Sequence, residues 1–272
     1  MPAVNKHIFL TGASSGIGIE TARILSARGF HVWGTSRDLK RLPALANFHP
    51  VTMDLTDLIS IRENFALALR EAGHFEVLIN NAGAGYFGAV EIQSDELLRE
   101  QFQLLVHGPL ELIRLVLPQM RQRQSGRIIN ITSLAARFPI PYLGPYSATK
   151  AALSSLSASL RLELADTAIR VTDLQPGDIL TNFHAATRRL DDSALRTPHS
   201  ALETVWHTIE RNMAAAPPPT LAAQAILRLI QNPNPPTVLA VGNFFQTRLA
   251  PLLARLASPR LVEWAIRRYY GI

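Results

Sequence analysis

The sequence contains no cysteine among its 272 residues. This absence excludes disulfide bonds and thiolate sites, and a chain without cysteine suits a reducing cytoplasm. The sequence also lacks any run of about 18 uninterrupted apolar residues, and its short N-terminal apolar segment does not have the pattern of a signal peptide. We therefore expect a cytoplasmic protein without a membrane-spanning helix.

Acidic residues are the minority, with 21 Asp and Glu against 27 Lys and Arg and a net charge of +6. The basic residues are not interleaved with aromatic residues, so nucleic acid is not an expected partner. Part of the positive charge suits cofactor phosphates, and the rest suits an acidic partner or an anionic membrane surface. Hydrophobic residues make up 47% of the chain, which is ample for one large core.

A glycine-rich turn follows the first apolar run directly. Gly12, Gly16 and Gly18 come after His7–Leu10, and a helical pattern of apolar residues begins at Ile17. A strand, a glycine turn and a helix start together present free backbone N–H groups and the positive end of a helix dipole to a pyrophosphate. The alternative is a tight strand-to-helix turn that binds no ligand.

The second apolar segment, Phe30–Thr35, ends at Ser36 and Arg37. In dinucleotide-binding folds an acidic side chain at this place binds the adenosine ribose, whereas arginine suits a 2′-phosphate. Ser36 occupies the acidic position, and Lys40 and Arg41 add further positive charge. This pattern favours NADP(H) over NAD(H); the alternative is a solvated surface arginine.

Tyr146 and Lys150 are four residues apart and would share one face of a helix. A phenol titrates near pH 10, and a neighbouring cation favours the phenolate and lowers that pKa. Ser133 ends an apolar run upstream and adds a hydroxyl. Such a group can exchange a proton with an alcohol or ketone without a metal, so no metal ligand is expected. The alternative is a partly exposed helix face with no catalytic role.

Several motifs occur in one order along the chain: Thr11-Gly12-Ala13-Ser14-Ser15-Gly16-Ile17-Gly18, Asp54-Leu55, Asn80-Asn81-Ala82-Gly83, Ser133, Tyr146 with Lys150, and Pro176-Gly177-Asp178-Ile179-Leu180-Thr181. In this order and spacing, over roughly residues 5 to 185, the chain resembles the short-chain dehydrogenase/reductase family in its single-domain form, with TGxxxGxG and YxxxK motifs. The resemblance implies an α/β fold of Rossmann type, with a doubly wound, mainly parallel seven-stranded sheet and helices on both faces.

The resemblance also implies roles for individual residues. Ser133 would hydrogen-bond the substrate oxygen, Tyr146 would exchange its proton, and Lys150 would lower the tyrosine pKa and hold the nicotinamide ribose. The cofactor-binding residues would be Gly12, Ser14, Ser15, Gly16, Ile17, Gly18, Arg37, Asp54, Leu55, Asn81, Ala82, Gly83, Tyr146, Lys150, Pro176, Gly177, Ile179 and Thr181. Asp54 could instead be a helix cap, and Asn80-Asn81 a plain turn at a strand end.

One position departs from the family pattern. The asparagine usual three residues before Gly108 is replaced by Leu105, which offers no side-chain hydrogen bond to the water that links the lysine to solvent in the family. Pro109 has no N–H and cannot bond the carbonyl of the residue four before it, which is Leu105. We therefore hypothesise that the Leu105 carbonyl holds that water.

An apolar wall is expected beside Tyr146. The predicted substrate-pocket residues are Phe138, Tyr142, Leu143 and Phe183, and they favour a lipophilic ketone, aldehyde or alcohol over a sugar. The alternative is ordinary core packing for each of them.

We expect residues 1–243 to form the catalytic domain, with a variable substrate lid at 184–219. Residues 244–272 alternate leucine with arginine at helical spacing and predict an amphipathic helical extension, split near Ser258-Pro259. Three roles for this extension stay open: packing onto the body or a second subunit, peripheral contact with a membrane, and docking of an acidic carrier protein.

These observations predict an NADP(H)-dependent oxidoreductase of a lipophilic carbonyl, such as a steroid, retinoid, fatty or 3-oxoacyl compound, the last carried on a protein. The alternative, motivated by Leu105, is a catalytically weak NADP-binding regulatory protein. The resemblance further implies a homodimer or homotetramer.

Overall fold

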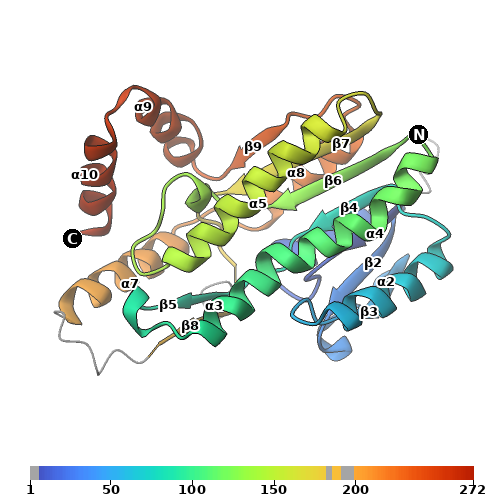
Figure 1. The fold of residues 1–272 in the computed structure, drawn as a ribbon, viewed down its shortest axis with the longest axis horizontal. Coiled ribbons are helices and arrows are strands. Elements are labelled where there is room, and N and C mark those ends of the chain that lie inside the picture. Colours follow the sequence, from blue (N-terminus) through green and yellow to red (C-terminus); the bar gives the residue numbers. More distant parts are fainter. Residues whose placement is uncertain (1–5, 182–185, 191–198) are drawn as a thin grey trace.

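The structure, a computed structural model, describes residues 6–181, 186–190 and 199–272 (Figure 1). Its central sheet has seven strands, all parallel, in the order β3-β2-β1-β4-β6-β7-β9. These strands are β1 His7–Leu10, β2 His31–Ser36, β3 Phe48–Thr52, β4 Val77–Asn80, β6 Gly126–Ile131, β7 Ile169–Pro176 and β9 Val238–Val241. The prediction of a doubly wound parallel sheet of seven strands is confirmed.

Helices cover both faces of this sheet (Figure 1). The helices are α1 Gly16–Ala27, α2 Leu58–Ala72, α3 Asp95–Phe102, α4 Gly108–Gln122, α5 Gly144–Glu163, α7 His199–Ala214, α8 Thr220–Gln231, α9 Ala250–Leu256 and α10 Pro259–Tyr270. Helices α2, α4 and α5 bury apolar residues in one core cluster, and α1 and α8 bury theirs in another. The parallel strands are buried on both sides, which explains why they appear in the sequence as short apolar runs without alternation.

The helix that runs from α3 to α4 is irregular where the sequence departs from the family pattern. A π-helical turn, Gln103–His107, separates the two α-helices, and the N–H of Gly108 bonds the carbonyl of Gln103. Leu105 lies in this turn with only 1% of its surface exposed. The hydrogen-bond register of the helix therefore shifts at Leu105, while the water hypothesised at its carbonyl stays a prediction.

The C-terminal extension forms two helices, α9 and α10, separated at Ser258. The Ser258 hydroxyl accepts a hydrogen bond from the Leu261 N–H at 3.4 Å and caps α10. We call α9 and α10 together the arm. The arm lies beside the sheet edge that ends in β9 and turns back toward α7 (Figure 1). Among the described residues, no helix combines the length and apolarity needed to cross a membrane.

Candidate active site

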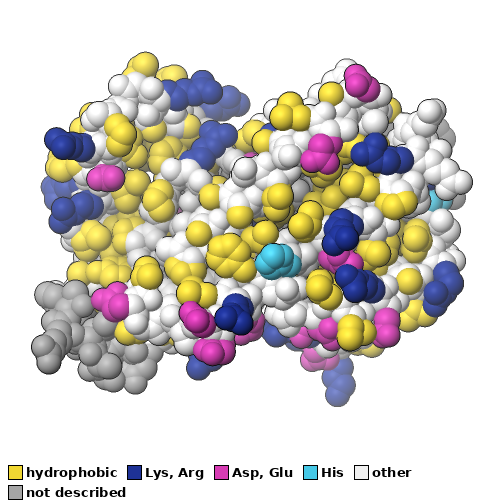
Figure 2. All heavy atoms as spheres, viewed as in Figure 1, with side chains coloured by type: hydrophobic (Ala, Val, Ile, Leu, Met, Phe, Trp, Pro, Cys, Tyr) yellow, Lys and Arg dark blue, Asp and Glu magenta, His cyan; other side chains and the backbone are white. Residues whose placement is uncertain are grey.

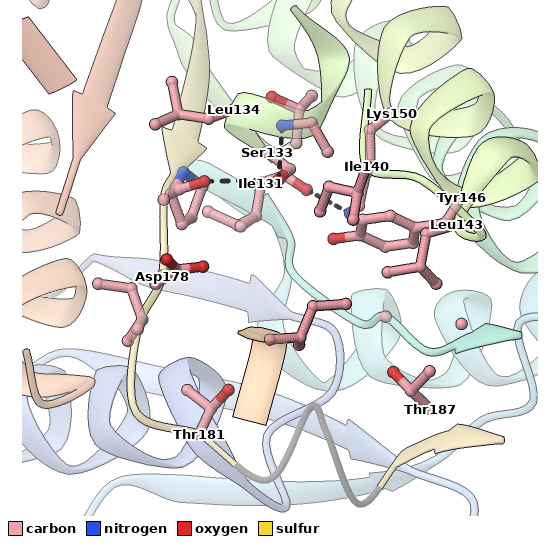
Figure 3. Close-up of a pocket in the computed structure, with 18 of the residues that line it drawn as sticks. Ile131, Ser133, Leu134, Ile140, Leu143, Tyr146, Lys150, Asp178, Thr181 and Thr187 are labelled. Atoms are coloured by element: carbon pink, nitrogen blue, oxygen red, sulfur yellow. Dashed lines mark hydrogen bonds between the residues drawn. The ribbon is translucent and has the colours of Figure 1, made fainter. Parts of the chain in front are cut away.

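A cleft of about 1550 Å³ runs along the carboxyl ends of the central strands. It opens where the strand order reverses between β1 and β4, which is where ligands bind in open α/β sheets. The side chains of Ser133, Tyr146 and Lys150 lie on one wall of the cavity, with Asp178 and Thr181 across from them (Figure 3). The cleft therefore brings the N-terminal and C-terminal motifs of the sequence together.

The glycine turn forms one end of the cleft, and its backbone geometry requires glycine. Gly12 and Gly16 have φ angles of 68° and 53°, in the left-handed region. A Cβ atom on Gly12 would lie 2.8 Å from the Cα atom of Ala82, and one on Gly18 would lie 2.0 Å from the Gly12 carbonyl oxygen. Asn81 fixes the turn, because its side-chain amide donates to the carbonyl of Gly12 at 3.1 Å.

These features fit the pyrophosphate of a dinucleotide. Helix α1 begins after Ser15 with no side-chain cap and no acidic residue in its first turn. Its first N–H groups and the positive end of its dipole therefore remain available to an anion in the cleft. All of the predicted cofactor residues except Gly18 line the cleft: Gly12, Ser14, Ser15, Gly16, Ile17, Arg37, Asp54, Leu55, Asn81, Ala82, Gly83, Tyr146, Lys150, Pro176, Gly177, Ile179 and Thr181.

The part of the cleft that follows β2 carries both charges. Arg37 and Arg41 line it, and so does Asp38, which follows the end of β2. The Asp38 carboxylate accepts a hydrogen bond from the Lys40 N–H at 3.0 Å and caps the short 3₁₀ turn Leu39–Arg41. Part of the hydrogen-bonding capacity of this carboxylate is therefore used within the protein.

Asp54 is not a helix cap. Asp57 caps α2 by accepting a hydrogen bond from the Ile59 N–H at 2.8 Å. The Asp54 carboxylate instead accepts bonds from the N–H and hydroxyl of Thr56, at 2.9 and 2.7 Å. This local turn holds Asp54 at the edge of the cleft.

Ser133 and Tyr146 come from separate elements and are joined by a side-chain hydrogen bond. Ser133 stands at the end of β6, where its Oγ accepts a bond from the Ala135 N–H at 3.0 Å. Tyr146 lies in the first turn of α5 and is 7% exposed. The two hydroxyl groups therefore face the cleft as one unit.

Burial decides the charge states of the tyrosine and the lysine. It raises the pKa of Tyr146 to about 12, although the hydrogen bond from Ser133 acts in the opposite direction. Burial also lowers the pKa of Lys150 to about 8, and the nearby Asp173 carboxylate opposes this shift. We expected Lys150 to lower the pKa of Tyr146. In the structure, burial instead raises this pKa. The Lys150 ammonium lies 5.7 Å from the Tyr146 ring centroid, and its hydrogen bond goes to the Ile131 carbonyl.

Two buried polar networks support the site, and the sequence indicated only Asn80, whose motif was expected to brace the central sheet. The Asn80 amide donates to Asn130 Oδ1 at 2.8 Å, and the Asn130 amide donates to Ser157 Oγ at 2.8 Å, linking β4 and β6 to α5. In the second network the Asp173 carboxylate accepts bonds from Thr132, Ser154 and Gln175. Single polar residues inside apolar strands are the signal that could have revealed both networks.

The predicted substrate residues divide into three groups. Phe138 and Leu143 line the cleft. Tyr142 does not: it has a φ angle of 63°, and its ring packs against Phe87 at a centroid distance of 5.8 Å. The Tyr142 side chain is half-buried and packs against the apolar cluster that contains Phe87, so a contact between Tyr142 and the substrate stays a prediction. Phe183 lies outside the described residues.

The arm supplies much of the apolar lining at the far end of the cleft. Its contributing residues include Leu253, Leu256, Leu261, Trp264 and Ala265, and α7 adds Trp206, Ile209 and Met213. On the face shown in Figure 2, hydrophobic side chains gather over the arm and beside it, with Lys and Arg at its outer edge. The sequence placed leucines at helical spacing here but did not indicate that they line the same cleft as Ser133, Tyr146 and Lys150.

A polar contact ties the arm to the loop that follows β7. Gln246 accepts a bond from the Asp178 N–H at 3.1 Å and donates to the Asp178 carboxylate and to the Tyr269 hydroxyl. The Asn212 amide of α7 also donates to the Tyr269 hydroxyl, at 3.0 Å. Burial raises the pKa of the Asp178 carboxyl. The arm is therefore attached both to the cofactor side of the cleft and to α7.

Comparisons with known proteins agree with this geometry. The family model described as short chain dehydrogenase matches residues 6–191. A 3-ketodihydrosphingosine reductase from Bacteroides thetaiotaomicron is 35% identical over 271 residues, which cover 97% of this chain and 98% of that protein.

Solved structures of the same family superpose on most of the chain. A short-chain dehydrogenase from Streptomyces avermitilis is 33% identical, with a TM-score of 0.80 over 94% of this chain and 96% of that one. A short-chain dehydrogenase from Sphingobium yanoikuyae in complex with NADPH is 26% identical, with a TM-score of 0.69 over 86% of this chain and 87% of that one. The chain therefore belongs to the short-chain dehydrogenase/reductase family, oxidoreductases that act on small molecules with a nicotinamide cofactor.

Proposed function

We propose that the protein is an NADP(H)-dependent reductase of a ketone or aldehyde on a long alkyl chain. The observation that carries the proposal is the hydrogen-bonded pair of Ser133 and Tyr146, placed between the glycine turn and the apolar end of one cleft. A carbonyl group held at this pair would have the cofactor on one side and apolar side chains on the other.

In this mechanism bound NADPH supplies the hydride to the carbonyl carbon. The Ser133 hydroxyl donates a hydrogen bond to the carbonyl oxygen, and Tyr146 gives its phenolic proton to the alkoxide that forms. Hydride and proton together convert the carbonyl to an alcohol, and the reverse steps oxidise the alcohol. Positioned proton transfer of this kind contributes about 10²–10⁴-fold to the rate.

The charge states of Tyr146 and Lys150 at neutral pH are those from which carbonyl reduction starts. A pKa of about 12 keeps the Tyr146 phenol protonated at neutral pH, and an alkoxide is a stronger base than phenolate. A pKa of about 8 leaves Lys150 mainly cationic at pH 7, where it stabilises the phenolate left after proton transfer. The same ammonium lies beside the cleft and would hold the nicotinamide ribose.

The preference for NADP(H) rests on the part of the cleft that follows β2. Arg37 and Arg41 line it, while the Asp38 carboxylate caps the adjoining turn. Guanidinium groups pair well with a phosphate, so both arginines suit the 2′-phosphate of NADP(H). The NADPH found in the Sphingobium yanoikuyae relative supports the proposal.

The arm supports a long-chain substrate over a compact one. Its exposed apolar side chains extend the cleft beyond the catalytic pair, and burial of an alkyl chain against them would be favourable in proportion to the area covered. The relative named 3-ketodihydrosphingosine reductase aligns with this chain over nearly its whole length. 3-Ketodihydrosphingosine is a ketone on a long alkyl chain, so it is the first compound to test.

The decisive experiment is NADPH oxidation by the purified protein with a panel of carbonyl compounds. The panel contains 3-ketodihydrosphingosine, a short-chain ketone, a steroid ketone, retinal and a 3-oxoacyl group on its carrier protein. We expect the highest kcat/KM for the free long-chain ketone. Highest activity with the carrier-linked compound would instead favour docking of an acidic carrier on the arm.

A second candidate is favoured by one observation. Leu105 is fully buried at the place where the family has a polar residue, so proton supply to the site could be slow. Tight NADPH binding with no turnover across the panel would favour the regulatory protein. We also expect a cytoplasmic homodimer or homotetramer; sedimentation measures the assembly, and vesicle flotation measures peripheral membrane contact.

A further inference from the structure

A row of histidines crosses the sheet away from the cleft. His49, His31 and His7 belong to the neighbouring strands β3, β2 and β1, and His74 lies three residues before β4, the next strand in the sheet. Their ring centroids are 5.5 Å apart for His31 and His49, 5.4 Å for His7 and His31, and 5.0 Å for His7 and His74. The row lies toward the amino ends of the strands, whereas the cofactor cleft lies at their carboxyl ends.

One half of the row, His31 and His49, forms hydrogen bonds within the protein. His49 bonds the Glu71 carboxylate at 3.0 Å and the His31 ring at 3.2 Å. Glu71 also accepts a bond from the Trp33 indole at 3.1 Å, and this indole stacks on His49 at a centroid distance of 4.0 Å. Packing and hydrogen bonding account for this half without a ligand.

The other half is made of His7, His74 and Glu76, and it contains an unpaired polar atom. The Nδ1 atom of His7 is buried and has no hydrogen-bond partner in the part of the chain that the structure describes. His74 Nε2 lies 2.5 Å from the Glu76 carboxylate, which also accepts a bond from the His7 backbone N–H at 2.6 Å. This nitrogen therefore has a free position for a further group, beside a histidine and a carboxylate.

The three side chains have the spacing of a metal-binding cluster. One potential ligand atom from each lies within 4.8 Å of the other two. A tetrahedral zinc ion with bonds of about 2.0–2.1 Å separates its ligand atoms by about 3.4 Å and the centres of two bound imidazoles by about 5 Å. The rings of His7 and His74 are already 5.0 Å apart. The side chains of His74 and Glu76 are partly exposed, at 27% and 20%, and can make the remaining movement.

We propose that His7, His74 and Glu76 bind one divalent transition metal ion of the zinc type, with water completing the coordination. Two imidazoles and a carboxylate suit zinc, whereas Mg²⁺ prefers an all-oxygen octahedral site. The ion would join His7 of β1 to Glu76 in the segment before β4. These two residues are 69 positions apart in the chain. Its role is therefore structural, and it is separate from the hydride-transfer site.

Nearby cations limit the affinity of this site. Arg123 contacts the Glu76 carboxylate at 3.4 Å, and an ion that binds Glu76 must compete with this guanidinium. Lys6 and Arg127 also lie close enough for charge interaction, since Glu76 and Arg127 act in opposite directions on the Lys6 pKa. The bound ion must therefore gain its affinity from three simultaneous ligands.

The test is a Zn²⁺ titration of the full-length, untagged protein after treatment with a chelator. Competition with a chromogenic chelator gives the affinity, and elemental analysis after gel filtration gives the stoichiometry. We expect one zinc ion per chain and a rise in melting temperature with zinc, because an ion that binds only the folded state stabilises it. Mg²⁺ at the same concentration should leave the melting temperature unchanged.

Two variants identify the site, and a third is the matched control. Glu76→Gln and His74→Gln should each weaken zinc binding by at least about tenfold and remove the thermal shift. His207→Gln should leave both unchanged, although His207 is also a histidine paired with a glutamate, 3.1 Å from Glu210. Circular dichroism in the absence of zinc checks that each variant is folded, and if one variant fails to fold, the other decides. The proposal would be overturned if the wild-type protein retained no zinc. It would also be overturned if His207→Gln weakened zinc binding as much as the two site variants did.

Discussion

The Lys150 ammonium donates a hydrogen bond to the carbonyl oxygen of Ile131 at 2.8 Å, across 19 positions of the chain. This bond ties α5 to the carboxyl end of β6, two residues before Ser133. It also keeps the ammonium beneath the Tyr146 ring, 5.7 Å from its centroid. This contact, together with the bonds of Ser157 to Asn130 and of Ser154 to Asp173, fixes α5 against the strands.

Turnover should depend on the phenolic hydroxyl group of Tyr146. Tyr146→Phe removes the proton donor and should lower kcat for ketone reduction by about 10²–10⁴-fold, while NADPH binding, followed by its fluorescence, remains. Tyr142→Phe is the matched control, because that ring packs against Phe87 and does not line the cleft. Equal activity in the two variants would rule out Tyr146 as the proton donor.

The burial of Lys150 should appear in the pH dependence of stability. Its pKa falls from an ordinary 10.5 to about 8 in the folded protein, so between these values the unfolded chain binds more protons than the folded one. The folding stability contributed by this group therefore rises as pH rises from 8 to 10.5.

Lys150→Met removes this titration. Relative to the variant, the wild-type protein should gain at most roughly 3 kcal/mol of unfolding free energy over that pH range. Urea unfolding of both proteins at several pH values measures the difference. A difference that is constant with pH would mean that Lys150 is not buried as the structure shows.

Cofactor selectivity should depend on Arg37. Arg37→Ala should weaken NADPH binding by about tenfold or more through loss of a phosphate contact, with little effect on NADH. Fluorescence titration with both cofactors measures the ratio, and Arg121→Ala, an exposed arginine on α4, controls for the loss of positive charge. An equal change for NADPH and NADH would contradict the assigned phosphate contact.

The arm should determine the preference for long chains. Trp264 lines the cleft and is 62% exposed, so Trp264→Ala removes apolar surface from the proposed chain path without opening the core. We expect the KM for a long-chain ketone to rise about tenfold, and kcat/KM for a short ketone to stay unchanged. Leu162→Ala is the control, because Leu162 is 81% exposed and lies away from the cleft. A parallel loss with both ketones would show that the arm acts on catalysis rather than on chain binding.

The stability of the protein should be sensitive to a polar substitution at Leu105. It is 1% exposed and packs in the apolar cluster that contains Tyr146, so Leu105→Asn should reduce the unfolding free energy by about 3 kcal/mol. Leu105→Met keeps the volume and should cost less than about 1.5 kcal/mol. Chemical denaturation measures both. Turnover raised a hundredfold in Leu105→Asn would show that the proton relay is missing in the natural chain.

The sequence by itself determined the parts of this protein that depend on local spacing. The glycine turn is recognisable because Gly12, Gly16 and Gly18 follow an apolar run at once, and the helical spacing of Tyr146 and Lys150 places them on one face. Repeated apolar runs between helical segments predicted the parallel sheet, since buried parallel strands and crossover helices have these patterns. Family membership followed from the order of the motifs.

Only the tertiary structure decided the properties that depend on residues far apart in the chain. The Tyr146 pKa rises because several elements bury the phenol, and the spacing of Lys150 alone suggested the opposite direction. Tyr142 packs against Phe87 and does not line the cleft, and Gln246 joins Tyr269 of the arm to Asp178 after β7.

The row of histidines also depends on residues that are far apart in the chain. Its members stand apart in the sequence and meet because parallel strands bring their amino ends to one edge of the sheet. Burial and contacts across strands are sums over the whole fold, and no local pattern contains them.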